Sequence, residues 1–246
     1  MSTSLSTTTN GVLLAKSLTP PPPPPPPKIA VIICSQRCPR IGDQIGTFVY
    51  DALKQYQTTA PDSSSYELCL VDLADHPLPF FDEPVIPQTI TSPLDYHHEH
   101  TRQWSRLISS CSAFVFVTPQ YNWSFPANLK NAIDYLFHEW AGKPAMVVSY
   151  GGHGGGKSAE QLTQVLSAVR MNVVSRTVGL MFPKQGEDGR AFLKKAARGS
   201  DLGLAGERKS DEVLWAKEMG AVRELFAELV GMMMLSLSLQ GEKSAE

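Results

Sequence analysis

A short apolar run at residues 113–117, Ala-Phe-Val-Phe-Val, restricts the fold of this chain more than any other feature. Aromatic and β-branched residues without polar interruption are typical of a strand covered on both faces, as in parallel sheets. The run leads into an aromatic, amide-rich loop at residues 118–126. Because ligands bind beyond the carboxyl ends of parallel strands, this loop is a predicted binding site for a flat, hydrogen-bonding molecule.

Apolar runs and helical periodicity alternate along the rest of the chain. Further strands are predicted at residues 28–34, 66–73, 144–150 and 172–181, and helices at 41–56, 94–110, 128–140, 157–170 and 211–234. Strands that alternate with helices at these lengths predict an α/β fold with a doubly wound parallel sheet and helices on both faces. Five strands suit the flavodoxin-like order, in which a mononucleotide binds at the switch point.

The two ends of the chain differ in character. Residues 1–27 are Ser/Thr-rich and end in an unbroken proline run, which predicts a disordered tail and a stiff spacer dispensable for folding. Residues 28–246 are expected to form one domain, with a polar, flexible excursion at 185–209.

Charge, hydropathy and cysteine spacing exclude several classes of protein. The net charge is −2 without a basic block, so no electrostatic footprint for nucleic acid exists. No stretch approaches the roughly 20 apolar residues of a membrane span. The cysteines follow neither a CxxC nor a secreted pattern, which favours a reducing cytoplasm; they are Cys34, Cys38, Cys69 and Cys111.

The turn after the first predicted strand carries donors for a phosphate. Ser35 offers a hydroxyl, Arg37 and Arg40 offer guanidinium groups, and the start of the next helix offers free amides. The alternative is an ordinary polar turn with solvated arginines. The position after the first strand of a doubly wound sheet favours the phosphate site.

The loop at 118–126 could hold a planar ring, most simply a flavin. Pro119 restricts the backbone, Tyr121 can stack on a ring, and Gln120 and Asn122 supply amide groups. A loop that merely buries Tyr121 and Trp123 is the alternative.

A glycine-rich loop after the fourth predicted strand has two explanations. Residues 151–158, Gly-Gly-His-Gly-Gly-Gly-Lys-Ser, satisfy the phosphate-loop pattern of nucleoside triphosphatases. However, the following strand at 172–181 contains no acid to hold magnesium. The second explanation is that Gly151 and Gly152 let the backbone approach the edge of a bound ring.

Two further groups of residues have structural explanations. His97, His98 and His100 crowd one segment without regular ligand spacing, so we expect a solvated helix start and no metal. Cys34 lies at a strand end without an acid–base pair, which favours a small buried residue over a nucleophile.

Together these motifs resemble the NADPH-dependent FMN reductase family, with the greatest similarity to fungal NAD(P)H:quinone reductases. The resemblance covers residues 28–183 and rests on Ser35-x-Arg37, Thr118-Pro119-Gln120-Tyr121-Asn122, Leu129-Lys130-Asn131-Ala132-Ile133-Asp134 and Ser149-Tyr150-Gly151-Gly152. It implies a homodimeric flavoprotein that uses bound FMN to pass hydride from NADPH or NADH to quinones, flavins or similar acceptors. FMN would carry the chemistry, and no side chain would be catalytic.

The resemblance also implies roles for the site residues. Ser35, Arg37 and Arg40 would hold the phosphate, while Pro119, Gln120, Tyr121 and Asn122 line the ring and Gly151 and Gly152 border its other edge. The substrate would meet Tyr121, Asn122 and Trp123. Because no second nucleotide fingerprint occurs, both substrates must share one site, which predicts ping-pong kinetics. The aromatic residues Tyr96, Trp104 and Trp140 are candidates for the dimer interface. A flavin-binding protein that reports redox state to a partner is the alternative.

Overall fold

The computed structural model describes residues 25–59, 65–183, 186–204 and 214–243, so the predicted N-terminal tail lies outside it except for residues 25–27. The strands are β1 Lys28–Ile33, β2 Glu67–Asp72, β3 Cys111–Pro119, β4 Pro144–Gly151, β5 Asn172–Val173 and β6 Val178–Met181. The α-helices are α1 Gly42–Thr59, α2 Glu99–Ser109, α3 Ala127–Asp134, α4 Gly156–Ala168, α5 Gly186–Arg198 and α6 Ala216–Lys243.

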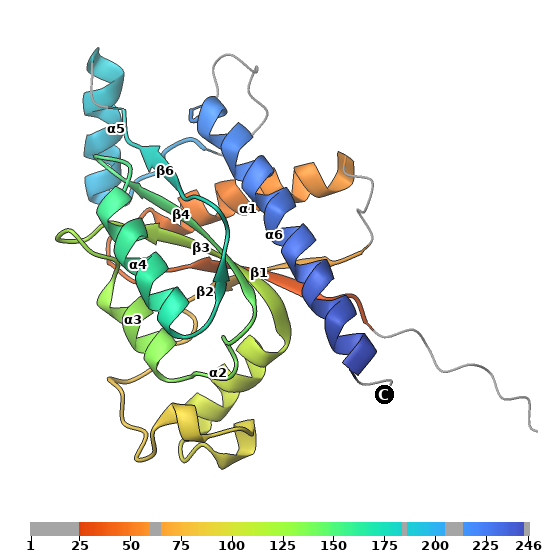
Figure 1. The fold of residues 1–246 in the computed structure, drawn as a ribbon. Helices are drawn as coiled ribbons and strands as arrows, with labels where there is room; N and C mark the ends of the chain where they lie inside the picture. Colours follow the sequence, from red (N-terminus) through yellow and green to blue (C-terminus); the bar gives the residue numbers. More distant parts are fainter. Residues whose placement is uncertain (1–24, 60–64, 184–185, 205–213, 244–246) are drawn as a thin grey trace, which may run out of the picture.

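The strands form one parallel sheet in the order β2-β1-β3-β4-β5, with β6 also paired to β4 (Figure 1). This order and the helices on both faces confirm the predicted doubly wound, flavodoxin-like fold. Among the described residues, no helix is both long and apolar enough to cross a membrane.

The sheet separates two apolar cores because neighbouring side chains of a strand point to opposite faces. Along β1, Ile29 and Val31 join the core under α1 and α6. Ala30 and Ile32 join the core under α2, α3 and α4. The central strands are therefore buried on both faces, as their continuous apolar runs predict.

The sequence predicted one continuous fifth strand at 172–181. This prediction was wrong, because the structure has two short strands there, β5 and β6. Between them, the Ser175 backbone N–H and hydroxyl both donate to the carboxylate of Glu228 on α6, each at 2.7 Å. Arg176 pairs with Glu224 on the same helix at 2.6 Å. Bonds to α6 replace the sheet bonds that a continuous strand would make at these positions.

Helix α2 begins at Glu99 rather than at the predicted residue 94. A 3₁₀ turn at Pro93–Asp95 precedes it. The carboxylate of Glu83 accepts the backbone N–H groups of His97 at 2.9 Å and His98 at 3.0 Å, which fixes the chain just before the helix. The capping carboxylate comes from a distant loop, so local periodicity could not locate this start.

The large aromatic residues proposed for a dimer interface lie in the core instead. Tyr96, Trp104 and Trp140 are at most 2% exposed. The indole N–H of Trp104 donates to the Ala132 carbonyl at 2.8 Å, and that of Trp140 donates to the Ile133 carbonyl at 3.2 Å. That prediction was wrong because α2 and α3 enclose these rings against the sheet.

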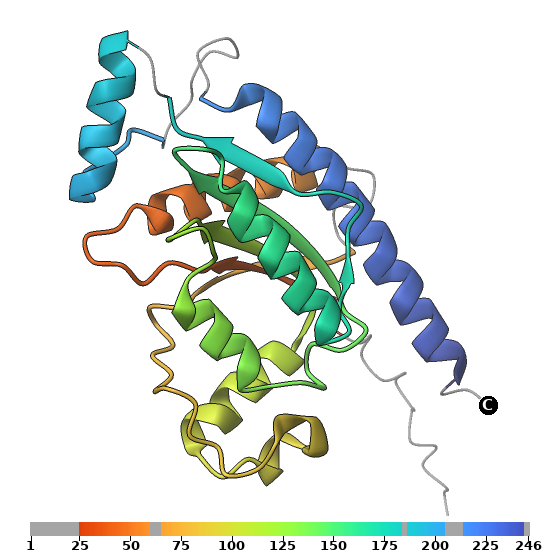
Figure 2. The same cartoon turned by 60° about the vertical axis from the view of Figure 1, so that its left-hand side comes forward.

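Helix α5 lies within the segment predicted as a flexible excursion, and its presence was not predicted. The chain that follows it packs on the turn between β1 and α1, and in Figure 2 the lower end of α5 lies just above that turn, drawn in orange. Gly199 adopts φ +65°, and a Cβ there would come within 2.8 Å of Pro39. Gln44 of α1 accepts the Leu202 N–H at 2.8 Å. Whether the segment moves stays a prediction.

Candidate functional site

Three turns meet at the carboxyl edge of the sheet. They follow β1, β3 and β4, which are adjacent strands in the order β1-β3-β4. The connection from β1 leads to β2 on one side, whereas β3 lies on the other, so the switch point falls between β1 and β3. All the residues predicted for cofactor binding lie on these turns or at the ends of these strands.

The turn after β1 holds the predicted phosphate ligands in different environments. Ser35 is buried and Arg37 is exposed. Arg40 is committed to neighbours: its guanidinium donates to Asp72 at 2.9 Å and to the Ser35 carbonyl at 2.7 Å. Burial alone would raise the pKa of Asp72, but hydrogen bonds from Arg40 and the Ala74 N–H lower it overall. Arg40 therefore ties the turn to the end of β2.

Tyr121 joins the turn after β3 to the turn after β1. Its hydroxyl donates to the Ser35 hydroxyl at 3.4 Å. The guanidinium carbon of Arg37 lies 5.1 Å from the centre of the Tyr121 ring, within the range of a cation–π contact. Three predicted site residues from two turns are thus in direct contact at the switch point.

The tip of the turn after β3 has an unusual backbone. Asn122 has φ 47° and Trp123 has φ 68°, and the Tyr121 and Ser124 backbones bond to each other at 2.8 and 3.0 Å. Positive φ at both central residues is typical of a type I′ turn, which normally contains asparagine and glycine. For a bulky residue such as Trp123, 68% exposed, this conformation is strained. Strain of this kind concentrates at functional sites.

Gln120 connects the same turn to β4 and α4. Its backbone N–H donates to the Tyr150 carbonyl at 3.1 Å, and its side-chain oxygen accepts the Lys157 N–H at 3.0 Å. A Cβ on Gly151 would lie 3.9 Å from Gln120, while one on Gly152 would meet open space. The glycine loop thus leaves room beside Gln120.

The phosphate-loop pattern of this glycine loop does not have the matching chemistry. The Ser158 hydroxyl is fully buried and donates to the Pro119 carbonyl at 2.9 Å, so it is not available to a metal ion. Lys157 pairs with Glu160 at 3.0 Å. The neighbouring strand β6 contains no acid. These contacts argue against a nucleoside triphosphatase.

Two residues of the site were missed by the sequence analysis. A Cβ on Gly42, the first residue of α1, would lie 2.5 Å from the Tyr150 hydroxyl and 2.6 Å from the Ser35 Cβ. The Tyr150 hydroxyl is buried and has no hydrogen-bond partner among the described residues. Burial raises its pKa well above the ordinary value, so it stays a neutral donor. A glycine at the predicted helix start was the available signal, and Tyr150 lies in a motif already noted.

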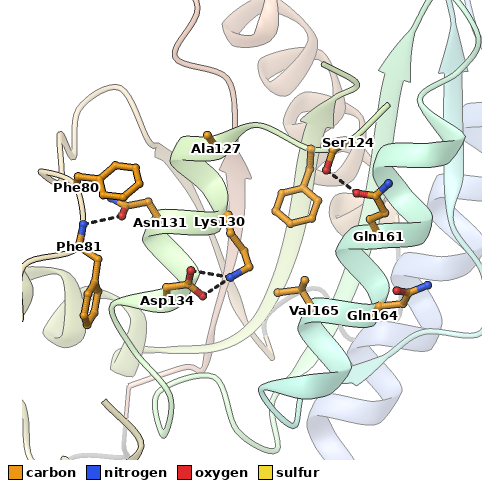
Figure 3. Close-up of a pocket in the computed structure, with 11 residues that line it drawn as sticks. Phe80, Phe81, Ser124, Ala127, Lys130, Asn131, Asp134, Gln161, Gln164 and Val165 are labelled. Carbon is orange, nitrogen blue, oxygen red and sulfur yellow. Dashed lines mark hydrogen bonds and ion pairs between the residues drawn. The ribbon is translucent and has the colours of Figure 1, made fainter. Parts of the chain in front are cut away.

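A neighbouring pocket of about 680 Å³ opens between α3 and α4. Figure 3 shows Phe80 and Phe81 on one side of it and Gln161, Gln164 and Val165 on the other. Ser124 and Phe125 of the β3 turn also line it. The turn that carries Tyr121 therefore separates the switch point from this second surface.

The thiol of Cys34 does not contribute chemistry to the site. It is completely buried, and burial raises its pKa well above the ordinary value. A thiol that stays protonated is a poor nucleophile, in agreement with the structural role predicted for this residue.

Comparison with known proteins gives a consistent result. The family model described as NADPH-dependent FMN reductase matches residues 27–184. An NAD(P)H-dependent FMN reductase of Saccharomyces cerevisiae is 44% identical over 149 residues, which are 60% of this chain and 77% of the relative. One from a Nectria species is 34% identical over 203 residues, 82% of this chain and 98% of the relative.

Among solved structures, the fold is similar to that of FerB, a flavoenzyme NAD(P)H:(acceptor) oxidoreductase from Paracoccus denitrificans. The TM-score is 0.53 at 21% identity, and the match covers 82% of this chain and 98% of that one. This likeness supports the fold, while the family model and the fungal relatives establish the kinship. The chain belongs to the NADPH-dependent FMN reductase family.

Proposed function

We propose that this chain, a flavin-dependent NAD(P)H oxidoreductase by its family, binds FMN across the three turns and passes hydride from NADPH or NADH to a quinone or free flavin. The contact of Ser35, Arg37 and Tyr121 carries the proposal. It places a hydroxyl, a cation and an aromatic ring together at the switch point, where mononucleotides bind in this fold. Quinones suit the acceptor role because they are planar, and quinone reductases are among the proteins this chain resembles.

The phosphate of FMN would lie at the turn after β1. Ser35 and Arg37 would bind it together with the free N–H groups of the first turn of α1. The unpartnered Tyr150 hydroxyl next to Ser35 and Gly42 adds a donor at this end. Arg40 would act indirectly, because its pairing with Asp72 holds the turn in shape.

The ring would lie between the turns after β3 and β4. Pro119, Gln120, Tyr121 and Asn122 would line one side, and Gly151 and Gly152 would border the other edge. Bound FMN supplies the hydride-transfer chemistry, and the protein supplies orientation and electrostatics. Tyr121, Asn122 and the exposed Trp123 would position the substrates against it.

The absorbance spectrum of the purified protein tests flavin binding, and an Arg37→Ala variant tests the site. Loss of one charge-assisted hydrogen bond, about 1.5–3 kcal/mol, should weaken FMN binding about 10- to 150-fold. Arg176→Ala is the matched control, because Arg176 is exposed and pairs with Glu224 far from the three turns. Equal FMN affinity in both variants would contradict the phosphate site.

Turnover separates an enzyme from a redox-reporting protein that binds the same flavin. We expect steady-state NADPH oxidation that accelerates strongly when a quinone is added. A yellow protein whose NADPH oxidation is negligible with quinones and with free flavins would favour the reporting role instead.

The active form is proposed to be a cytoplasmic homodimer. Apolar side chains in the segment between β2 and α2 are open to solvent: Phe80, which lines the pocket, is 90% exposed, Ile86 69% and Leu94 75%. Exposed apolar clusters of this kind favour an interface. Phe80→Asp should shift the particle from dimer to monomer in light scattering, whereas Leu235→Asp on α6, 62% exposed in the wild type, should not. The cysteines, all free, suit a reducing cytoplasm.

A further inference from the structure

Two imidazoles and one carboxylate converge away from the three turns. Asp82 lies in the loop after β2, and His98 and His100 lie at the start of α2. Nε2 of His100 is 3.2 Å from Asp82 Oδ1, and Nε2 of His98 is 3.7 Å from Asp82 Oδ2. One ligating atom from each residue lies within 4.8 Å of the other two.

These distances are close to those of ligands around one small metal ion. With metal–ligand bonds of about 2.0–2.1 Å, tetrahedral ligands lie roughly 3.3–3.4 Å from one another. The two histidine–Asp82 separations, 3.2 and 3.7 Å, are near this value, and the two imidazole nitrogens lie within 4.8 Å of each other. Imidazole suits zinc and neighbouring transition metals, whereas calcium and magnesium prefer all-oxygen sites.

Buried groups hold the ligands in place. The hydroxyl of Tyr135 donates a hydrogen bond to Asp82 Oδ1 at 2.8 Å, and Tyr135 is fully buried. The buried carboxylate of Glu83 accepts the backbone N–H groups of His97 and His98. Partners that orient the ligands from outside the coordination sphere are a regular part of metal sites.

A simple ion pair between histidine and Asp82 explains the cluster less completely. The rings of His98 and His100 are nearly parallel, at 10°, with centres 5.0 Å apart. His98 Nε2 lies 3.2 Å from the Asp82 backbone carbonyl, and His100 Nε2 lies 3.2 Å from Asp82 Oδ1, so both nitrogens are turned toward the same residue. A single ion pair would use only one of these imidazoles, whereas one divalent cation would take both nitrogens and the carboxylate as ligands.

We propose that Asp82, His98 and His100 bind one divalent transition-metal ion of the zinc class, with a fourth position open to water. This departs from the solvated helix start expected from the sequence, because Asp82 is 16 residues from His98 and joins it only through the fold. Phe80 and Phe81 of the pocket precede Asp82 directly, so the ion would fix the loop that forms this wall. The site is separate from the proposed flavin site.

Metal titration of the tag-free full-length chain, stripped with a chelator, tests the site. Calorimetry with zinc should give one ion per chain, and cobalt should give the intense visible bands of tetrahedral coordination. Asp82→Asn and His100→Gln should each weaken zinc binding at least about 10-fold, and Tyr135→Phe about 10- to 100-fold. His138→Gln, at an exposed histidine outside the cluster, should bind as the wild type does.

Failure of the wild type to bind zinc or cobalt would overturn the proposal, as would unchanged binding in the Asp82→Asn/His100→Gln double variant. The side chains of Asp82 and His100 are 40% and 31% exposed, so the variants at these two positions should keep the wild-type circular dichroism. A measurement on the unaltered chain is independent of variant folding. Zinc should protect His98 and His100, but not His138, from diethyl pyrocarbonate as detected by mass spectrometry. Equal modification of all three would also reject the site.

Discussion

Arg40 and Asp72 form a two-pronged ion pair that closes the turn after β1 against the end of β2. The side chains are only 23% and 15% exposed, and Arg40 also donates to the Ser35 carbonyl. Ser35 is therefore held in place by a residue that the sequence suggested as a phosphate ligand in its own right. The pair connects the stability of this edge of the sheet to the shape of the proposed phosphate site.

Asp72→Asn should destabilise the protein by about 1–3 kcal/mol at pH 7, because a half-buried Arg40 loses its charged partner. Folding lowers the pKa of Asp72, so its contribution is present above the unfolded pKa of about 3.9 and is lost as pH falls through the folded value. The difference in free energy of unfolding between the wild type and the variant should thus become smaller below about pH 4. Urea unfolding of both proteins at pH 7, 5 and 3.5 measures this difference.

An exposed ion pair provides the control for this prediction. Glu224 and Arg176 are 72% and 54% exposed, and such pairs contribute about 0–1 kcal/mol. Glu224→Gln should therefore have a small effect at every pH. Equal losses in the two variants would show that the Arg40–Asp72 pair has no special role.

The sequence was sufficient for the fold class and the central strands because that information is local. Apolar runs located the central strands, and their alternation with helices predicted the sheet order. Contacts between residues distant in the sequence could not be predicted. Examples are the bonds from His98 to Glu83, from Ser175 to Glu228 and from Arg40 to Asp72. For the site, motifs identified the turns, whereas the packing of Gly42 on Tyr150 depends on how closely α1 approaches β4.

Gly42→Ala should lower both stability and FMN affinity. The added methyl would lie 2.5 Å from the Tyr150 hydroxyl and 2.6 Å from the Ser35 Cβ, so the turn after β1 must shift. Gly220→Ala in α6 is the matched control, since its Cβ would meet nothing within 4 Å. Removing a glycine from a helix interior should stabilise the protein by about 0.5–1 kcal/mol. Thermal unfolding and FMN titration of both variants measure their stability and FMN affinity. A Gly42→Ala variant with unchanged stability and unchanged FMN affinity would contradict the tight packing.

Trp123→Gly should separate stability from activity. Glycine adopts positive φ without strain, so the variant should be as stable as the wild type or up to about 1–2 kcal/mol more stable. The lost aromatic surface should lower kcat/KM for a quinone about 2- to 12-fold, from an aromatic contact of about 0.5–1.5 kcal/mol. Trp123→Phe should keep most of that activity. If quinone kinetics are equal in all three proteins, Trp123 does not face the acceptor.

Ping-pong kinetics are expected because the chain offers one edge for both substrates. In the described residues, the three turns at the carboxyl edge of a single sheet form the candidate site, and the turn after β1 contains no dinucleotide fingerprint. NADPH and the acceptor must therefore approach the same surface beside Tyr121, Asn122 and Trp123, and they cannot occupy it together. Initial rates with varied NADPH at several quinone concentrations should give parallel double-reciprocal lines. Lines that intersect would require a complex with both substrates bound, which a shared surface does not permit.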